Sequence, residues 1–88
     1  MLEREVEVMN ANGIHARPAA EIVKTAAKFA SHITIGRDGM DVNGKSIMGV
    51  MMLAAECGSV VRISAEGPDE EAAIAALALL VASKFGER

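Results

Sequence analysis

Aromatic residues are scarce in this 88-residue sequence, which has two Phe, no Trp and no Tyr. Proteins that bind single-stranded RNA or DNA stack the bases on aromatic side chains, and most nucleic-acid-binding domains carry excess basic charge. Here 12 acidic residues outnumber 9 Lys and Arg, for a net charge of −3. The composition therefore argues against nucleic acid as a partner.

Cysteine and long apolar runs are also scarce. The one cysteine, Cys57, cannot form an internal disulfide or the paired-ligand spacing of a structural zinc site. No apolar stretch approaches the ~20 residues that span a bilayer, and the charged first residues do not fit a signal peptide. We expect a cytoplasmic protein without membrane insertion, folded as a single domain over residues 1–88.

Hydrophobic periodicity indicates the order strand, helix, strand, strand, helix, strand, helix. Period-two alternation predicts strands at residues 2–8, 32–35, 40–42 and 61–65. Helical spacing predicts helices that begin near Ala16, near Ser46 and after Pro68. With connections this short, we expect an α+β open-faced sandwich (βαββαβα), a four-stranded antiparallel sheet covered on one face by three helices.

Finer expectations concern the second and third helices. The second has apolar residues at helical spacing, Ile47, Val50, Met51 and Ala54, of which Ile47, Met51 and Ala54 would suffice for packing. It is expected to end at Gly58 and to leave Cys57 half-buried. Acids at residues 69–71 are expected to complement the dipole of the last helix. Ile74, Leu77, Leu80, Val81 and Phe85 are expected to form its apolar stripe.

His15 lies between a turn at Gly13 and a predicted helix start at Ala16. Backbone N–H groups at a helix start lack intrahelical partners, and the dipole there is positive. The guanidinium group of Arg17 adds a positive charge and several N–H donors that suit phosphate oxygens. Positive surroundings also favour a neutral, nucleophilic imidazole. The pattern fits a phosphoryl-accepting histidine, and also a plain capping histidine beside a solvated arginine.

Other chemistries have weaker support in the sequence. No other His lies near His15, and no acid follows it before Glu21, so neither a metal site nor a hydrolytic triad is predicted. His32 falls on a predicted strand and is interpreted as a surface histidine. Residues 39–46 match the phosphate-loop pattern GxxxxGK[ST], but that loop belongs to larger parallel α/β domains, and residues 40–42 are needed as a strand. We expect no metal and no cofactor.

Residues 13–19, Gly-Ile-His-Ala-Arg-Pro-Ala, resemble throughout the histidine phosphorylation signature of the HPr phosphocarriers of the bacterial phosphoenolpyruvate-dependent phosphotransferase system. The resemblance extends to chain length and element order. It implies a carrier and not an enzyme: enzyme I would phosphorylate His15 on Nδ1, and His15 would pass the group to enzyme IIA domains for sugar uptake. Arg17, the N–H groups at Ala16 and the amide of Asn12 are expected to hold the phosphate.

Residues 45–51, Lys-Ser-Ile-Met-Gly-Val-Met, resemble the regulatory serine region of the same family. Ser46 is interpreted either as a plain helix cap or as the target of an HPr kinase/phosphorylase. We expect partners to bind a surface that comprises Ala20, Lys24, Ile47, Met48, Met51 and Met52. For the apolar residues of the second helix, the other interpretation is that all of them belong to the core.

Some members of the family carry lysines where this chain has Ala27 and Gly49. Positive charge around His15 is still expected from Arg17, Lys24, Lys28 and Lys45. Two further hypotheses stay open: a regulatory HPr-like protein, of the nitrogen-related branch or a corepressor partner switched at Ser46, and an unrelated small enzyme or binding domain with the same fold. We expect the chain to be a monomer.

Overall fold

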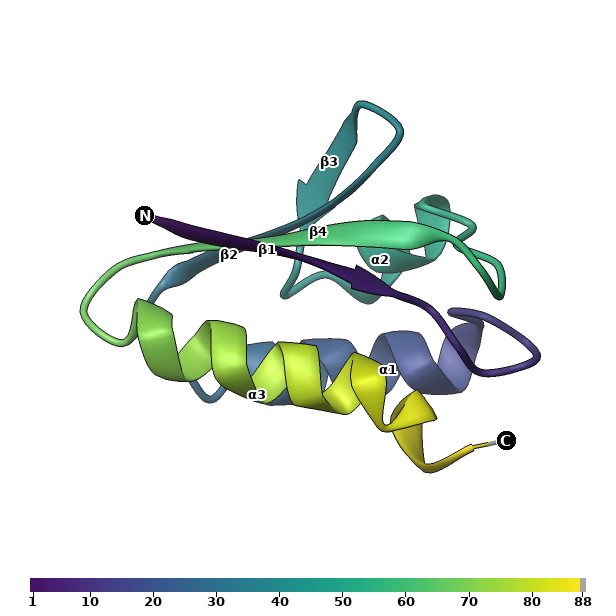
Figure 1. Cartoon of the computed structure of the whole chain (residues 1–88). Helices are drawn as coiled ribbons and strands as arrows, with labels where there is room; N and C mark the ends of the chain where they lie inside the picture. Colours follow the sequence, from purple (N-terminus) through teal and green to yellow (C-terminus); the bar gives the residue numbers. More distant parts are fainter. Residues whose placement is uncertain (88) are drawn as a thin grey trace.

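The computed structural model describes residues 1–87 and forms the expected elements in the expected order (Figure 1). The strands are β1 (Leu2–Glu7), β2 (His32–Arg37), β3 (Met40–Asn43) and β4 (Val60–Glu66). The helices are α1 (Ala16–Ala26), α2 (Ile47–Met52) and α3 (Glu70–Ala82), and the short 3₁₀ turn η1 (Lys84–Gly86) follows α3.

The four strands form one antiparallel sheet in the order β1-β4-β2-β3. In Figure 1, α1 and α3 run side by side along one face of this sheet, and α2 packs against α1 and β3. The register pairs Ile35 with Ile63 on the covered side and Glu5 with Arg62 on the open side. The open-faced sandwich is therefore confirmed.

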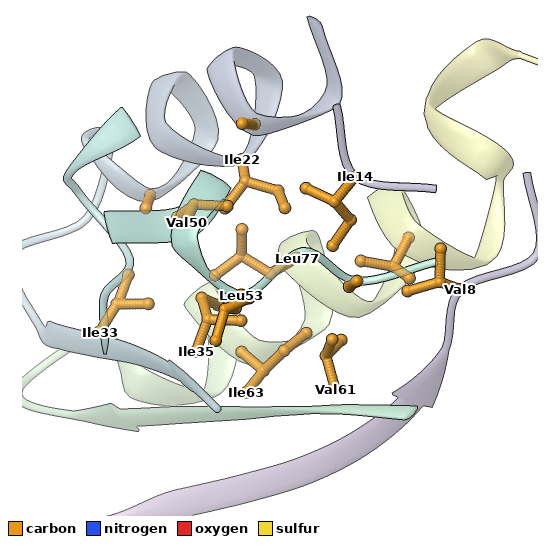
Figure 2. Close-up of a cluster of buried hydrophobic side chains, with 14 of the residues drawn as sticks. Val8, Ile14, Ile22, Ile33, Ile35, Val50, Leu53, Val61, Ile63 and Leu77 are labelled. Atoms are coloured by element: carbon orange, nitrogen blue, oxygen red, sulfur yellow. The ribbon is translucent and has the colours of Figure 1, made fainter. Parts of the chain in front are cut away.

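The core lies between the sheet and the helices (Figure 2). Ile33, Ile35, Val61 and Ile63 rise from the sheet and meet residues from all three helices, namely Ile22, Val50 and Leu77. Pro18 is buried in the first turn of α1, where its missing N–H has no intrahelical acceptor. The predicted start of α1 at Ala16 is confirmed.

The second helix differs from the prediction. It ends at Met52 and not at Gly58, and of the expected apolar positions it buries Val50 but leaves Ile47 and Met51 exposed. Leu53, at its C-cap, is also buried, whereas Ala54 has left the helix with φ 49° and is exposed. Both sets of positions have helical spacing, so periodicity alone cannot choose which face is buried.

Cys57 was expected to be half-buried and is exposed, because α2 has ended and the residue lies in the following loop. Asp69 is the N-cap residue of α3 and precedes Glu70 and Glu71 in the first turn, so the acids lie at the positive end of the helix as predicted, but the Asp69 side chain makes no capping hydrogen bond. Its carboxylate instead accepts hydrogen bonds from the N–H groups of Ala30 and Ser31 and from the Ser31 hydroxyl. These bonds, above all the one from the hydroxyl, lower the pKa of Asp69. The start of α3 is thus joined to the start of β2.

Candidate phosphoacceptor site

The segment before α1 holds His15 at the surface. Gly13 adopts φ +64°, a conformation that favours glycine, and the N–H of buried Ile14 donates to the Ala55 carbonyl over 2.8 Å. His15 is the N-cap residue of α1 in extended conformation, with 41% of its side chain exposed. Its side chain makes no capping hydrogen bond, which argues against the plain-cap interpretation.

The imidazole of His15 faces a carboxylate from the far end of the chain. His15 Nε2 lies 3.1 Å from both carboxylate oxygens of Glu87. The Asn10 amide donates to Glu87 Oε1 over 3.0 Å and to the Gly13 carbonyl over 2.8 Å. The hydrogen bond with His15, followed by the one from Asn10 and the charge of Arg17, lowers the pKa of Glu87.

The turn η1 brings Glu87 to this position. Lys84 and Phe85 both adopt positive φ, 60° and 55°, and turn the chain back after α3. The Phe85 ring is buried, so it anchors the turn against the core. No pattern in the sequence points to Glu87 or Asn10 as site residues, and the one signal near Glu87 is that Phe85 continues the apolar stripe of α3.

The helix start beside His15 is open to an anion. The N–H groups of Ala16 and Arg17 have no hydrogen-bond acceptor among residues 1–87, and both residues are exposed. Asn12 is also exposed and, with His15 and residues 54–57, lines a shallow hollow. The three predicted phosphate-binding residues therefore lie around His15, at the positive end of α1.

A comparison with protein families matches residues 2–83 to PTS-HPr, described as the PTS HPr component phosphorylation site. The chain belongs to this family. The phosphocarrier protein HPr of Treponema pallidum is 52% identical over 87 residues, which are 99% of this chain and 99% of that protein.

Solved structures agree with this assignment. The crystal structure of HPr-C-His from Thermoanaerobacter tengcongensis is 55% identical, with a TM-score of 0.96, and covers 100% of this chain and 99% of that one. A crystal structure described as an HPr dimer from the same organism, also 55% identical, has a TM-score of 0.79 and covers 99% and 100%. The predicted HPr fold is confirmed.

Positive charge is less concentrated at His15 than the sequence indicated. Arg17 lies beside it, but Lys24 is in the last turn of α1 and Lys28 lies beyond that turn. Lys45 Nζ donates to the Phe29 carbonyl, past the C-terminus of the same helix. Because the 11 residues of α1 span about 16 Å, these three cations are distributed along the helix and its far end.

The apolar residues of α2 are largely exposed, contrary to the interpretation that all of them are core. Exposed fractions are 45% for Ile47, 78% for Met48, 44% for Met51 and 65% for Met52. On α1, which packs against α2, Lys24 is exposed and Ala20 is half-buried. All six residues predicted to contact partners thus lie on two adjacent helices of this HPr fold.

Ser46 caps α2, as predicted. Its hydroxyl oxygen accepts a hydrogen bond from the Gly49 N–H over 3.1 Å. Residues 40–43 form β3, so the phosphate-loop match around them is a chance resemblance, as expected. His32 is exposed at the start of β2, and within residues 1–87 no group of three His, Cys, Asp or Glu is arranged to hold a metal ion.

Proposed function

We propose that this chain is a phosphocarrier that accepts a phosphoryl group from phosphorylated enzyme I on His15 and passes it to enzyme IIA domains for sugar uptake. The observation that carries the proposal is the half-exposed imidazole of His15 at the open N-terminus of α1, beside Arg17. A carrier has to expose its acceptor to two partners in turn. A residue at the surface meets that need better than one in a closed cleft.

The chemistry needs only groups that lie at this helix start. As the lone pair of His15 Nδ1 attacks phosphorus, the bond from phosphorus to the donor breaks and a phosphorus–nitrogen bond forms. The free N–H groups of Ala16 and Arg17 and the Arg17 guanidinium can receive the phosphoryl oxygens. Asn12 can add a side-chain hydrogen bond. Because these groups leave the phosphate open to solvent, the second partner can attack the same phosphorus.

We further propose that Ser46 is a substrate of an HPr kinase/phosphorylase. Its position at the N-cap of α2, next to exposed Ile47 and Met48, would bring a phosphate to the edge of the predicted partner-binding surface on α1 and α2, called the docking surface below. The regulatory HPr-like alternative is less favoured, since the T. pallidum relative, matched over its full length, is a phosphocarrier protein.

The chain is proposed to act as a cytoplasmic monomer of one domain. The single cysteine supports a reducing compartment, and the site of one chain is complete without residues from a second copy. Among residues 1–87, no helix is long and apolar enough to cross a membrane. Sedimentation velocity would test the oligomeric state against the dimer known for the T. tengcongensis relative.

The test of the carrier function uses phosphoenolpyruvate, enzyme I and either the wild-type chain or His15→Ala. We expect an acid-labile phosphohistidine signal in the phosphorus NMR spectrum of the wild type only. Circular dichroism of His15→Ala should match the wild type, because the His15 side chain makes no capping bond. A folded wild-type chain that accepts no phosphate from an enzyme I of the same organism would contradict the proposal.

A further inference from the structure

The contact between Glu87 and His15 constrains the proton on the imidazole ring. A carboxylate only accepts hydrogen bonds, and both oxygens of Glu87 lie 3.1 Å from Nε2. The Glu87 side chain is 14% exposed, so solvent competes weakly for it. In a neutral imidazole one nitrogen carries the proton and the other keeps its lone pair. A proton held on Nε2 by Glu87 therefore leaves the lone pair on Nδ1.

Asn10 holds Glu87 in place. The Asn10 side chain is fully buried, and its amide hydrogens donate to Glu87 Oε1 and to the carbonyl of Gly13, two residues before His15. The Asn10 amide thus connects Glu87 to the loop that carries the His15 imidazole. The side-chain oxygen of Asn10, Oδ1, has no hydrogen-bond partner among residues 1–87 although it is buried, which carries an energetic cost. An asparagine in this place therefore does not serve stability alone.

We propose that Glu87, held by Asn10, is a positioning residue that keeps the His15 proton on Nε2, so that Nδ1 is the only nitrogen available for phosphorylation. The inference concerns the same site as the proposed phosphocarrier function and rests on it. When the phosphorus–Nδ1 bond forms, the ring becomes an imidazolium that keeps its Nε2 proton, and the Glu87 carboxylate stabilises the positive charge. When the group leaves for the acceptor, the bonding electron pair returns to Nδ1 and the proton stays where it was.

The test uses a small donor, phosphoramidate, so that it does not depend on enzyme I. The phosphorus–nitrogen bond of the donor breaks, ammonia leaves, and either ring nitrogen of an unrestrained histidine can accept the group. We expect the wild type to give Nδ1-phosphohistidine only, and Glu87→Ala to give a mixture with the Nε2 isomer. Nitrogen-15 and phosphorus NMR distinguish the two products. A merely structural role for Glu87 would not alter which nitrogen reacts.

Three variants sharpen the result. Glu87→Asp should restore part of the selectivity, and Asn10→Ala should lose part of it, because the carboxylate is then held less firmly. Glu56→Ala is the matched control, since Glu56 lines the hollow beside His15 but, among residues 1–87, only Glu87 forms a hydrogen bond or ion pair with the ring. If Asn10→Ala does not fold, Glu87→Ala decides the question alone.

The two proposals fail in different ways. Exclusive Nδ1 phosphorylation of Glu87→Ala at any rate, or an Nε2 product from the wild type, would overturn the role of Glu87 and leave the carrier function intact. A wild type that reacts selectively with phosphoramidate but accepts nothing from enzyme I would contradict the carrier function and support the role of Glu87.

Discussion

The side-chain ammonium of Lys45 donates a hydrogen bond to the backbone carbonyl of Phe29 over 2.8 Å. Phe29 lies just past the end of α1 at Ala26, where the helix dipole is negative. The ammonium is thus fixed at the end of α1 opposite to His15. Although Lys45 is next to Ser46, in the segment that resembles the regulatory serine region of HPr proteins, its side chain joins the β3–α2 connection to the end of α1.

We therefore predict that Lys45→Met lowers the free energy of unfolding without slowing phosphorylation of His15. Hydrogen bonds that involve a charged group contribute about 1.5–3 kcal/mol, and we expect the lower part of that range at this half-buried site. Urea denaturation would measure the loss. Lys28→Met, which removes an exposed lysine from the same region, should change stability by no more than about 0.5 kcal/mol.

Gly13 is a position where the stability of the fold and the placement of His15 depend on the same close backbone approach. A Cβ at Gly13 would approach the backbone of Ala55 and Glu56, to within 2.9 Å of Glu56 Cα, and φ is +64°. Gly13→Ala should therefore cost more than about 2 kcal/mol and displace His15. Gly39→Ala is the control, because φ is +83° but nothing lies within 4 Å, so only the backbone strain of about 1 kcal/mol applies. Equal losses in thermal denaturation would show that the close approach is unimportant.

The order of elements and the place of His15 could be predicted because each depends on local patterns. Alternation, helical spacing and Pro18 in a first turn are all visible within a few residues. Glu87 could not be predicted, since it lies 72 residues from His15. It reaches the site only because Lys84 and Phe85 adopt left-handed conformations for which their side chains give no signal.

The prediction of which face of α2 is buried failed for a different reason. A six-residue helix rich in apolar side chains fits more than one buried face, and tertiary packing selects Val50. Asp69 shows a third limit. An acid at a helix start is predicted to complement the dipole, and Asp69 does lie there, but its hydrogen bonds could not be predicted because Ala30 and Ser31 precede it by 39 and 38 positions, respectively.

Those bonds predict an acid-dependent contribution to stability. The pKa of Asp69 is lowered in the folded chain, so its stabilisation is fully present above the ordinary value of 3.8 and is lost as pH falls through the folded-state pKa. Asp69→Asn should be less stable than the wild type at neutral pH, and the difference should shrink below about pH 4. Urea denaturation of both proteins at intervals of about one pH unit between pH 2 and pH 7 would show this convergence. In Glu71→Gln, where the carboxylate is exposed and accepts no side-chain hydrogen bond within residues 1–87, the curve should follow the wild type.

Met48 offers a test of the docking surface. Because Met48 is 78% exposed, Met48→Ala should leave the free energy of unfolding within about 0.5 kcal/mol of the wild type. If partners bind α2, the loss of this side chain should weaken binding to enzyme I by about 1–2 kcal/mol, or ~5–30-fold. Leu79→Ala removes a comparably exposed side chain, at 69%, from α3 and should leave binding unchanged. Isothermal titration with enzyme I would measure both, and equal effects would argue against a specific role for α2.

Ser46 allows the effect of charge to be separated from the effect of capping. Ser46→Asp keeps an acceptor for the Gly49 N–H, so its stability should stay near that of the wild type, whereas Ser46→Ala loses the cap and about 1 kcal/mol. Transfer from enzyme I should show the reverse order. The resemblance to HPr proteins implies an acidic donor surface, and a new negative charge beside Ile47 and Met48 should slow phosphorylation of His15 at least ~5-fold, for about 1 kcal/mol of repulsion. Stopped-flow phosphorylation would measure the rates. A wild-type rate in Ser46→Asp, or an equal slowing in Ser46→Ala, would show that charge at Ser46 does not control access to His15.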